Sequence, residues 1–213
     1  MIQGLLNLEN EQKFSIEDFI LSCANLEAYN SILHWEKWPN KKLLIIGPHK
    51  SGKTLLTTIW RKNTDAVVIK NVEDFKDAEK VIVDNIEELS EINLVNIINF
   101  TNERGLPLLL TANQYPSFNL KDLNSRIKSI YKVIIKEPDE ELLKLILAKS
   151  FKQLQIKISD EIISLIFRSI ERNYESAYEV VKFIDKLSKI TKRSVTLPFV
   201  REMLIKYYQT DDL

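Results

Sequence analysis

Residues 47–54 read Gly-Pro-His-Lys-Ser-Gly-Lys-Thr and fit the pattern G-x-x-x-x-G-K-[ST] in full. The segment follows the apolar run 43–46 and precedes a stretch with helical periodicity that starts at Lys53. A strand, a glycine-rich loop and a helix in this order form a nest of backbone N–H groups that binds phosphate. We expect Lys53 to reach the β- and γ-phosphates of a nucleotide and Thr54 to bind Mg²⁺. The expected nucleotide-binding residues here are Gly47, Pro48, His49, Lys50, Ser51, Gly52, Lys53, Thr54 and Leu55.

Composition excludes several classes of partner. The 213 residues are 45% hydrophobic, enough for a sizeable core, and 30 basic side chains balance 30 acidic ones. Such a chain has no overall positive field that would drive non-specific binding to nucleic acid or membranes. The single cysteine, Cys23, excludes an internal disulfide and a cysteine-based zinc site. The sequence has no signal-peptide pattern and no apolar run of about 20 residues, so we expect a soluble, cytoplasmic protein without a membrane partner.

The apolar pattern changes near residue 138. Upstream, five short runs rich in Val, Ile and Leu alternate with helical patterns and predict a parallel sheet covered on both faces. These runs are 43–46, 66–69, 80–83, 106–111 and 131–135. Downstream, helical periodicity predicts helices near 139–153, 159–172, 174–190 and 197–208, with Ser159 as an N-cap and Pro198 in a first turn. The predicted fold class is α/β, with a five-stranded parallel-sheet phosphate-loop domain followed by an all-α four-helix segment from residue 138.

A carboxylate follows the third predicted strand. Asp84 ends an apolar run, and behind a phosphate-binding loop this is the Walker B position that holds the water shell of Mg²⁺. An ordinary strand end is the alternative. The next residue is Asn85, where many ATPases have a second acid that polarises the attacking water. Because an amide accepts no proton, we expect slow intrinsic hydrolysis. Glu87 and Glu88 are candidates to replace that acid, although acids here are also typical of a helix start.

Asn113 closes the fourth predicted strand. Its side chain is expected at the same carboxyl edge of the sheet as the loop and Asp84, where ligands of open α/β sheets bind. Asn113 is therefore a candidate sensor that hydrogen-bonds the γ-phosphate or the attacking water. A turn residue is the alternative for an Asn in this place.

Several segments resemble the AAA+ ATPases of the bacterial replication-initiator group, the DnaA-like proteins, and most of all the shorter Hda type. Besides the loop, the resemblance is carried by Asp84-Asn85-Ile86-Glu87 and by segments 14–19, 109–111, 122–127 and 196–202. It covers nearly the whole chain. It implies an AAA+ core at 14–137 and a helical lid at 138–213, the binding of ADP or ATP with Mg²⁺, and a function in replication initiation.

The resemblance gives Arg126 a specific role. In this family the arginine of an Asp-Leu-x-Ser-Arg segment, here 122–126, acts as a finger on the nucleotide of a neighbouring subunit. A fixed guanidinium stabilises the charge that spreads over the γ-phosphate in the transition state. The implied target is ATP held by a DnaA-type initiator. The alternative is an arginine on a solvated helix face.

Two positions depart from the family pattern. Glu175 aligns where the family carries a phosphate-sensing arginine near the start of the third lid helix, and Gln114 stands where an arginine usually follows the sensor residue. A carboxylate that faces a triphosphate repels it, so ADP binding or a weak, slow site is expected. Arg172, one turn earlier, is either a compensating cation or a surface residue.

The N-terminal residues 1–8 resemble the short peptide with which Hda-like proteins bind the replicative sliding clamp, the β subunit of DNA polymerase III. Gln3, Leu6 and Leu8 match its pocket-filling residues, whereas Gly4 stands where a leucine is common. The alternative is a tail that folds onto its own domain. We assign residues 1–13 to this tail, and we expect DNA to be contacted only indirectly, through the clamp.

Only residues 208–213 follow the last predicted helix, so we expect no initiator-type helix-turn-helix domain and interpret the chain as a regulator of an initiator. Two other functions stay open. One is a phosphate-loop kinase of small molecules, which needs arginines on a lid in mid-chain. The other is an adaptor with a vestigial nucleotide site that only occupies the initiator surface. The sequence leaves the oligomeric state open, a homodimer included.

Overall fold

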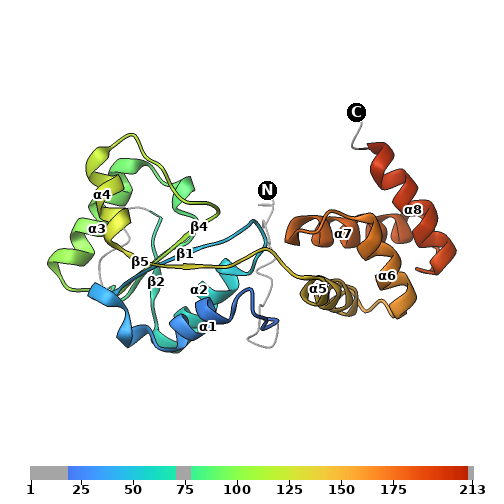
Figure 1. Ribbon diagram of the computed structural model, residues 1–213, viewed down its shortest axis with the longest axis horizontal. Helices are drawn as coiled ribbons and strands as arrows, with labels where there is room; N and C mark the ends of the chain where they lie inside the picture. Colours follow the sequence, from blue (N-terminus) through green and yellow to red (C-terminus); the bar gives the residue numbers. More distant parts are fainter. Residues whose placement is uncertain (1–18, 71–77, 211–213) are drawn as a thin grey trace, which may run out of the picture.

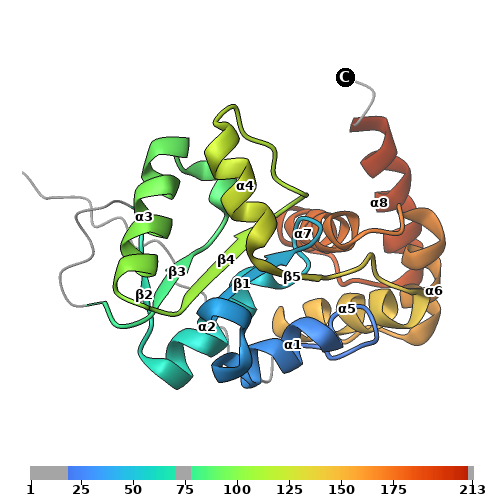
Figure 2. The ribbon, with the colours of Figure 1, turned by 60° about the vertical axis from the view of Figure 1, so that its left-hand side comes forward.

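The computed structural model describes residues 19–70 and 78–210, the last two by their backbone alone. Its first half contains a parallel sheet (Figure 1), whose five strands have the order β2-β3-β4-β1-β5 (Figure 2). The strands are β1 (Lys42–Ile46), β2 (Val67–Val68), β3 (Val81–Val83), β4 (Leu108–Ala112) and β5 (Tyr131–Ile134). Each overlaps its predicted run, which confirms the predicted fold class. The edge strand β2 is shorter than predicted because its neighbour β3, itself three residues long, pairs with only two of its residues.

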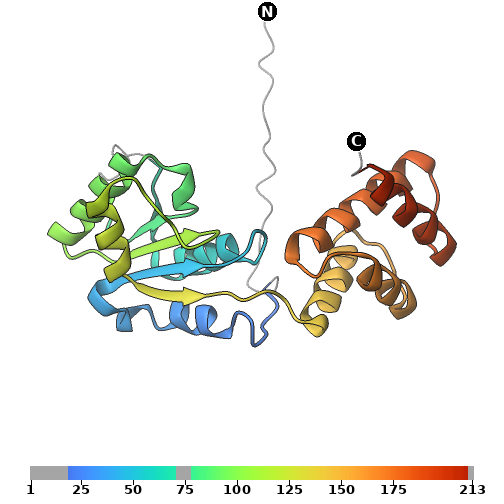
Figure 3. The same ribbon diagram turned by 45° about the horizontal axis from the view of Figure 1, so that its top comes forward.

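Helices cover both faces of the sheet, as Figures 2 and 3 show. The helices are α1 (Leu26–Leu33) and α2 (Lys53–Thr64) on one face, and α3 (Glu91–Glu103) and α4 (Lys121–Ser129) on the other. Successive side chains of β1 point to opposite faces, as the period of a strand requires. Leu43 therefore packs in the core under α1 and α2, whereas Leu44 packs in the core under α3 and α4. Among the described residues, short 3₁₀ helices lie in the connections: η2 (Trp35–Lys37), η3 (Pro39–Lys41) and η5 (Ile86–Glu88).

Four helices with a core of their own follow the sheet: α5 (Glu140–Gln153), α6 (Asp160–Ser169), α7 (Tyr174–Thr191) and α8 (Leu197–Thr210). Each of the four overlaps its predicted segment. Ser159 occupies the N-cap position of α6, but its side chain makes no capping bond. α6 ends earlier than predicted because Ile170 is extended and packs into the helical core. Asn173 then caps α7 by accepting a hydrogen bond from the Ser176 N–H at 2.8 Å.

The connection between sheet and helices is held by specific contacts. The buried Tyr174, at the start of α7, donates its hydroxyl to the carbonyl of Lys136 at 3.0 Å. Burial raises the pKa of the Tyr174 phenol, with the Glu137 and Asp139 carboxylates adding to the shift. The Lys136 N–H donates to the carbonyl of Ala24, which itself packs into the helical core. These contacts set the start of α7 beside the sheet. Within the described parts of the chain, no helix is both long and apolar enough to cross a membrane.

Candidate functional site

The carboxyl edge of the sheet brings the predicted nucleotide-binding residues together. Gly47 follows β1, Asp84 follows β3 and Asn113 follows β4, and β4 lies between the other two strands. The register pairs the last residue of β1 with the last residue of β4, Ile46 with Ala112. The three positions therefore stand side by side, as the sequence predicts.

The loop between β1 and α2 depends on both of its glycines. Gly52 has a φ of +94°, a left-handed conformation that favours glycine, and an added Cβ would meet Phe19 Cε2 at 3.0 Å. At Gly47 an added Cβ would lie 2.8 Å from Ile135 Cβ. The loop also contains Ser51, whose buried hydroxyl has no hydrogen-bond partner among the described residues. A concave backbone with an unpaired buried hydroxyl is a suitable cradle for a phosphate group.

Lys53 is the first residue of α2 and is buried. Its ammonium folds back on the loop and donates to the carbonyls of Gly47 and Pro48, each at 2.8 Å. Burial lowers the pKa of Lys53, and the carboxylates of Asp84 and Glu87 oppose this shift. The ammonium therefore sits at the loop and within the field of two acids of the same sheet edge.

Asp84 is fixed by a residue that the sequence analysis did not single out. Its Oδ1 accepts a hydrogen bond from the Thr111 hydroxyl at 2.6 Å, and that hydroxyl in turn accepts one from the Asn85 N–H at 2.7 Å. Thr111 is fully buried in the otherwise apolar strand β4. A polar side chain within an apolar strand next to Asp84 was the available signal for this role.

Asn113 is held by two neighbours on the same edge. Its amide Nδ2 donates to Asn85 Oδ1 at 3.1 Å, and its backbone N–H donates to Glu87 Oε1 at 2.6 Å. Asn85 has a φ of +62°, a left-handed conformation that asparagine tolerates better than most residues. Asn85 therefore has a structural function that its sequence position did not reveal. Glu87 is the best candidate for the second carboxylate. It accepts a hydrogen bond from the Asn113 N–H, and its charge raises the pKa of Lys53.

The helical segment contributes an acid to the loop. Glu175 lies in the first turn of α7, and its Oε1 lies 3.2 Å from Nδ1 of the loop residue His49. The structure thus places Glu175 at the loop, as expected from its alignment with the phosphate-sensing arginine of the family. The Arg172 guanidinium stacks over the ring of Phe167 at 5.4 Å from its centroid and so packs against α6.

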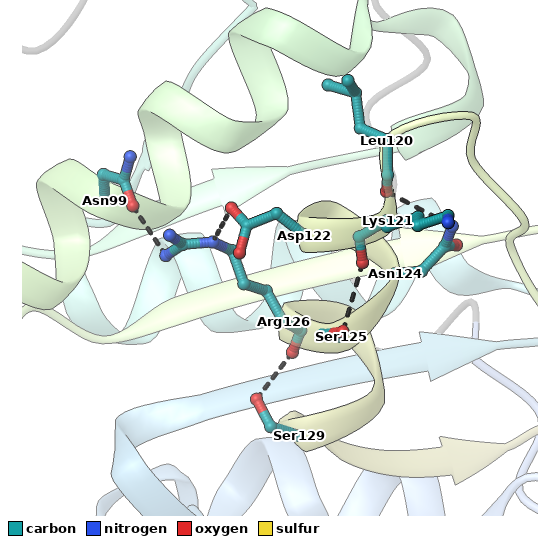
Figure 4. Close-up of polar contacts among 8 residues, drawn as sticks. All are labelled: Asn99, Leu120, Lys121, Asp122, Asn124, Ser125, Arg126 and Ser129. Carbon is teal, nitrogen blue, oxygen red and sulfur yellow. Dashed lines mark hydrogen bonds and ion pairs between the residues drawn. The ribbon is translucent and has the colours of Figure 1, made fainter.

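Arg126 lies elsewhere. In α4 its Nε donates to Asp122 Oδ2 at 2.6 Å and its Nη1 donates to Asn99 Oδ1 at 2.7 Å (Figure 4). The side chain is one-third exposed, at 33%. Arg126 lines a pocket together with Asn40 and Lys42, at the amino end of β1, whereas Gly47 follows the carboxyl end. The five residues of β1 at about 3.3 Å each separate the two ends by about 16 Å. The structure therefore does not bring Arg126 to the phosphate loop of its own chain.

The predicted clamp-binding residues Gln3, Leu6 and Leu8 lie outside the described residues. The described residues contain no group of three or more His, Cys, Asp or Glu side chains that could hold a metal ion by themselves. The predicted magnesium ligands, Thr54 and Asp84, differ in exposure, since Thr54 faces solvent and Asp84 is partly buried.

Comparison with known proteins identifies relatives of this chain. The family described as Hda, lid domain, matches residues 139–204. The chromosomal replication initiator protein DnaA of Flavobacterium psychrophilum is 23% identical over 205 residues, which cover 83% of this chain and 42% of that protein. An uncharacterized protein of Haemophilus influenzae is 29% identical over 144 residues, which cover 62% of this chain and 62% of that protein. The chain thus spans less than two thirds of the length of these curated relatives.

Solved structures share the fold. Domain III of the Thermotoga maritima replication initiation protein DnaA matches with a TM-score of 0.73 at 18% identity, covering 89% of this chain and 95% of that chain. AMPPCP-bound DnaA from Aquifex aeolicus matches with a TM-score of 0.64 at 20% identity, covering 81% and 64%. The order of the loop, Asp84 and Asn113 along one sheet edge agrees with this fold. Residues 139–204 therefore match the lid domain of the Hda family, and the chain shares the fold of DnaA domain III.

Proposed function

We propose that this protein is an Hda-like cytoplasmic regulator of replication initiation that stimulates hydrolysis of ATP held by a DnaA-type initiator. The position of Arg126 carries the proposal. Its guanidinium lies at the amino end of β1, which the length of the strand separates from the loop by about 16 Å, and Asp122 and Asn99 hold it in place. An arginine so fixed and partly exposed is suited to a nucleotide bound by a partner rather than by its own chain.

The carboxyl edge of the sheet fits an adenine nucleotide. Ser51 and Lys53 offer a hydroxyl and an ammonium to the phosphates, and Thr54 and Asp84 would hold Mg²⁺. When bound, the metal would neutralise phosphate charge. The AMPPCP-bound DnaA relative supports the choice of an adenine nucleotide. In this proposal residues 14–137 form the nucleotide-binding core and residues 138–213 the lid.

Hydrolysis at the protein's own site is proposed to be slow. The position after Asp84 holds Asn85, which accepts no proton and is already engaged with Asn113. Asn113 can still act as a sensor, because its amide donates one N–H to Asn85 and has a second N–H for a γ-phosphate or an attacking water. The protein therefore acts mainly through its partner.

The function is tested by phosphate release. The DnaA-type initiator is loaded with radiolabelled ATP and mixed with this protein and DNA-loaded clamp. We expect at least tenfold faster hydrolysis than with the initiator alone. Binding to the initiator without faster hydrolysis would favour the adaptor instead, and phosphate transfer to a nucleoside monophosphate without an initiator would favour a kinase.

Glu175 is expected to set the balance between ADP and ATP. Its carboxylate adds negative charge beside the loop, which penalises the additional charge of a γ-phosphate. The wild-type protein should bind ADP at least as tightly as ATP in calorimetric titrations. Glu175→Arg should shift the ratio of the two affinities toward ATP by about tenfold, which is about 1.4 kcal/mol.

Glu175→Gln is the matched control, because it removes the charge and supplies no cation. It should shift the ratio in the same direction by less. A wild-type protein with strong ATP preference, or an unchanged ratio in Glu175→Arg, would exclude this role of Glu175.

Residues 1–8 are proposed to bind the sliding clamp. Deletion of these residues, or Gln3→Ala with Leu6→Ala, should abolish co-elution with the clamp in size-exclusion chromatography. The melting temperature should hardly change, since a terminal tail contributes little to the core. If the truncated protein binds the clamp equally well, or is strongly destabilised, the tail belongs to its own domain.

A further inference from the structure

A small polar pocket lies at the amino end of β1, whereas the phosphate loop lies at the carboxyl end of the same strand. Its volume is about 140 Å³, and its walls include Asn40, Lys42, Ile98, Asn102, Arg126 and Ser129. The pocket thus collects two cationic side chains from two different elements, β1 and α4. The nucleotide site at the other edge of the sheet does not use it.

Lys42 is the most unusual residue of the pocket. It is only 7% exposed, and its side chain lies on the same sheet face as Leu44, above an apolar core. Its ammonium has three N–H donors. In the part of the chain that the structure describes, the only acceptor that Nζ contacts is the carbonyl oxygen of Asn40, and this distance of 3.5 Å is longer than an ordinary hydrogen bond. Among the described residues, no carboxylate lies within ion-pair distance of it. Burial lowers the pKa of Lys42, with a further contribution from Lys41.

Arg126 adds a second cation with donors to spare. Two of its nitrogens, Nε and Nη1, donate to Asp122 and Asn99. A guanidinium carries five N–H donors, so further donors are left for a ligand. Asp122 compensates one positive charge and is mostly exposed, at 65%. Lys42, Arg126 and Asp122 together leave the pocket with a net positive charge.

We propose that the Lys42–Arg126 pocket binds a small tetrahedral oxyanion of the phosphate type. A buried ammonium without a counter-charge is costly, and an oxyanion supplies both the charge and several acceptors. At about 30 Å³ per water molecule, the pocket has room for such an ion with a little water. A whole nucleotide is excluded, because pockets for ligands of that size start near 300 Å³.

The site shares Arg126 with the proposed finger, but its test needs neither initiator nor clamp and so can fail or succeed separately. Its test must separate it from the phosphate loop, which is also expected to bind phosphate. The experiment therefore uses the full chain with Lys53→Met, a substitution that is expected to weaken phosphate binding at the loop. Thermal unfolding is measured at pH 7 against increasing sodium phosphate, with sodium chloride keeping the ionic strength constant. The dependence of the melting temperature on phosphate gives the apparent Kd.

The apparent Kd for phosphate should rise at least tenfold when Lys42→Met is added to Lys53→Met. The stem of methionine fills the place of the lysine stem, so Lys42→Met should melt above its parent in chloride alone, as the buried charge is gone. Arg126→Gln in the same background should also raise the Kd, without that gain in stability. Lys41→Met is the matched control, because it removes the neighbouring cation outside the pocket and should leave the Kd within twofold.

Sulfate and acetate distinguish the ligand chemistry. Sulfate should stabilise the Lys53→Met protein like phosphate, and acetate should stabilise it much less. Acetate as effective as phosphate would overturn the proposal in favour of a carboxylate from a protein partner. Equal phosphate Kd values with and without Lys42→Met would overturn it altogether, and Arg126→Gln decides the question if Lys42→Met does not fold.

Discussion

Arg126→Ala is expected to lower initiator-directed ATP hydrolysis by at least tenfold while leaving folding, nucleotide binding and clamp binding intact. Arginine fingers contribute about 10³–10⁵ to the rate of phosphoryl transfer, so tenfold is a conservative lower limit. The contribution is expected because Asp122 of the same helix and Asn99 of α3 already fix the guanidinium before the partner's nucleotide meets it. The measurement is the phosphate-release assay with initiator, clamp and DNA.

The accompanying variants separate charge from geometry. Arg126→Lys should restore little activity, because an ammonium lacks the planar fork that the two neighbours orient. Asn99→Ala keeps the guanidinium and loosens it, so an intermediate loss is expected. Lys128→Ala removes one positive charge from an exposed position of the same helix and should have little effect. Normal stimulation by Arg126→Ala would refute the finger and leave Arg126 as a solvated residue of α4.

The fold could be predicted from the sequence because the patterns that indicate its helices and strands are local. Short runs of Val, Ile and Leu mark the strands, and helical periodicity marks α5 to α8. The edge position of Asp84 and Asn113 followed from parallel strands and needed no contact information. The family resemblance was then sufficient to align Glu175 with the loop, where the structure places it.

The remaining features depend on contacts between distant residues. Thr111 holds Asp84 across 27 positions of sequence, and a single threonine in an apolar strand indicates a buried polar contact without indicating its partner. From the sequence, Lys42 is an ordinary polar residue at the start of a strand. Only the packing of α3 and α4 shows that it is buried beside Arg126. Asn85 was interpreted by what it lacks, an acidic group, whereas the structure shows that it positions Asn113.

The proposed nucleotide site and the proposed finger lie at opposite edges of one sheet. The loop, Asp84 and Asn113 stand at the carboxyl edge, and Arg126 stands at the amino edge. Because the two edges use different side chains, a change at one edge is expected to leave the side chains of the other in place. The two activities are therefore expected to be separable by mutation, and the second strong prediction concerns the carboxyl edge alone.

Lys53→Ala is expected to weaken the binding of both ADP and ATP by about 100-fold or more. The ammonium is expected to be the main counter-charge of phosphates bound at the loop, and hydrogen bonds to charged groups contribute about 1.5–3 kcal/mol each. Two such bonds are enough for a loss of this size. Calorimetric titration with each nucleotide measures it, with Lys53→Met as a variant that keeps the buried stem.

Stability must be followed in parallel, because Lys53 also ties the loop together through the carbonyls of Gly47 and Pro48. Arg61→Ala removes a cation from the exposed end of the same helix and should bind both nucleotides normally. If either Lys53 variant folds and still binds nucleotide with wild-type affinity, the loop is not the phosphate site. In that case stimulation through Arg126 would have to be explained without a nucleotide in this chain.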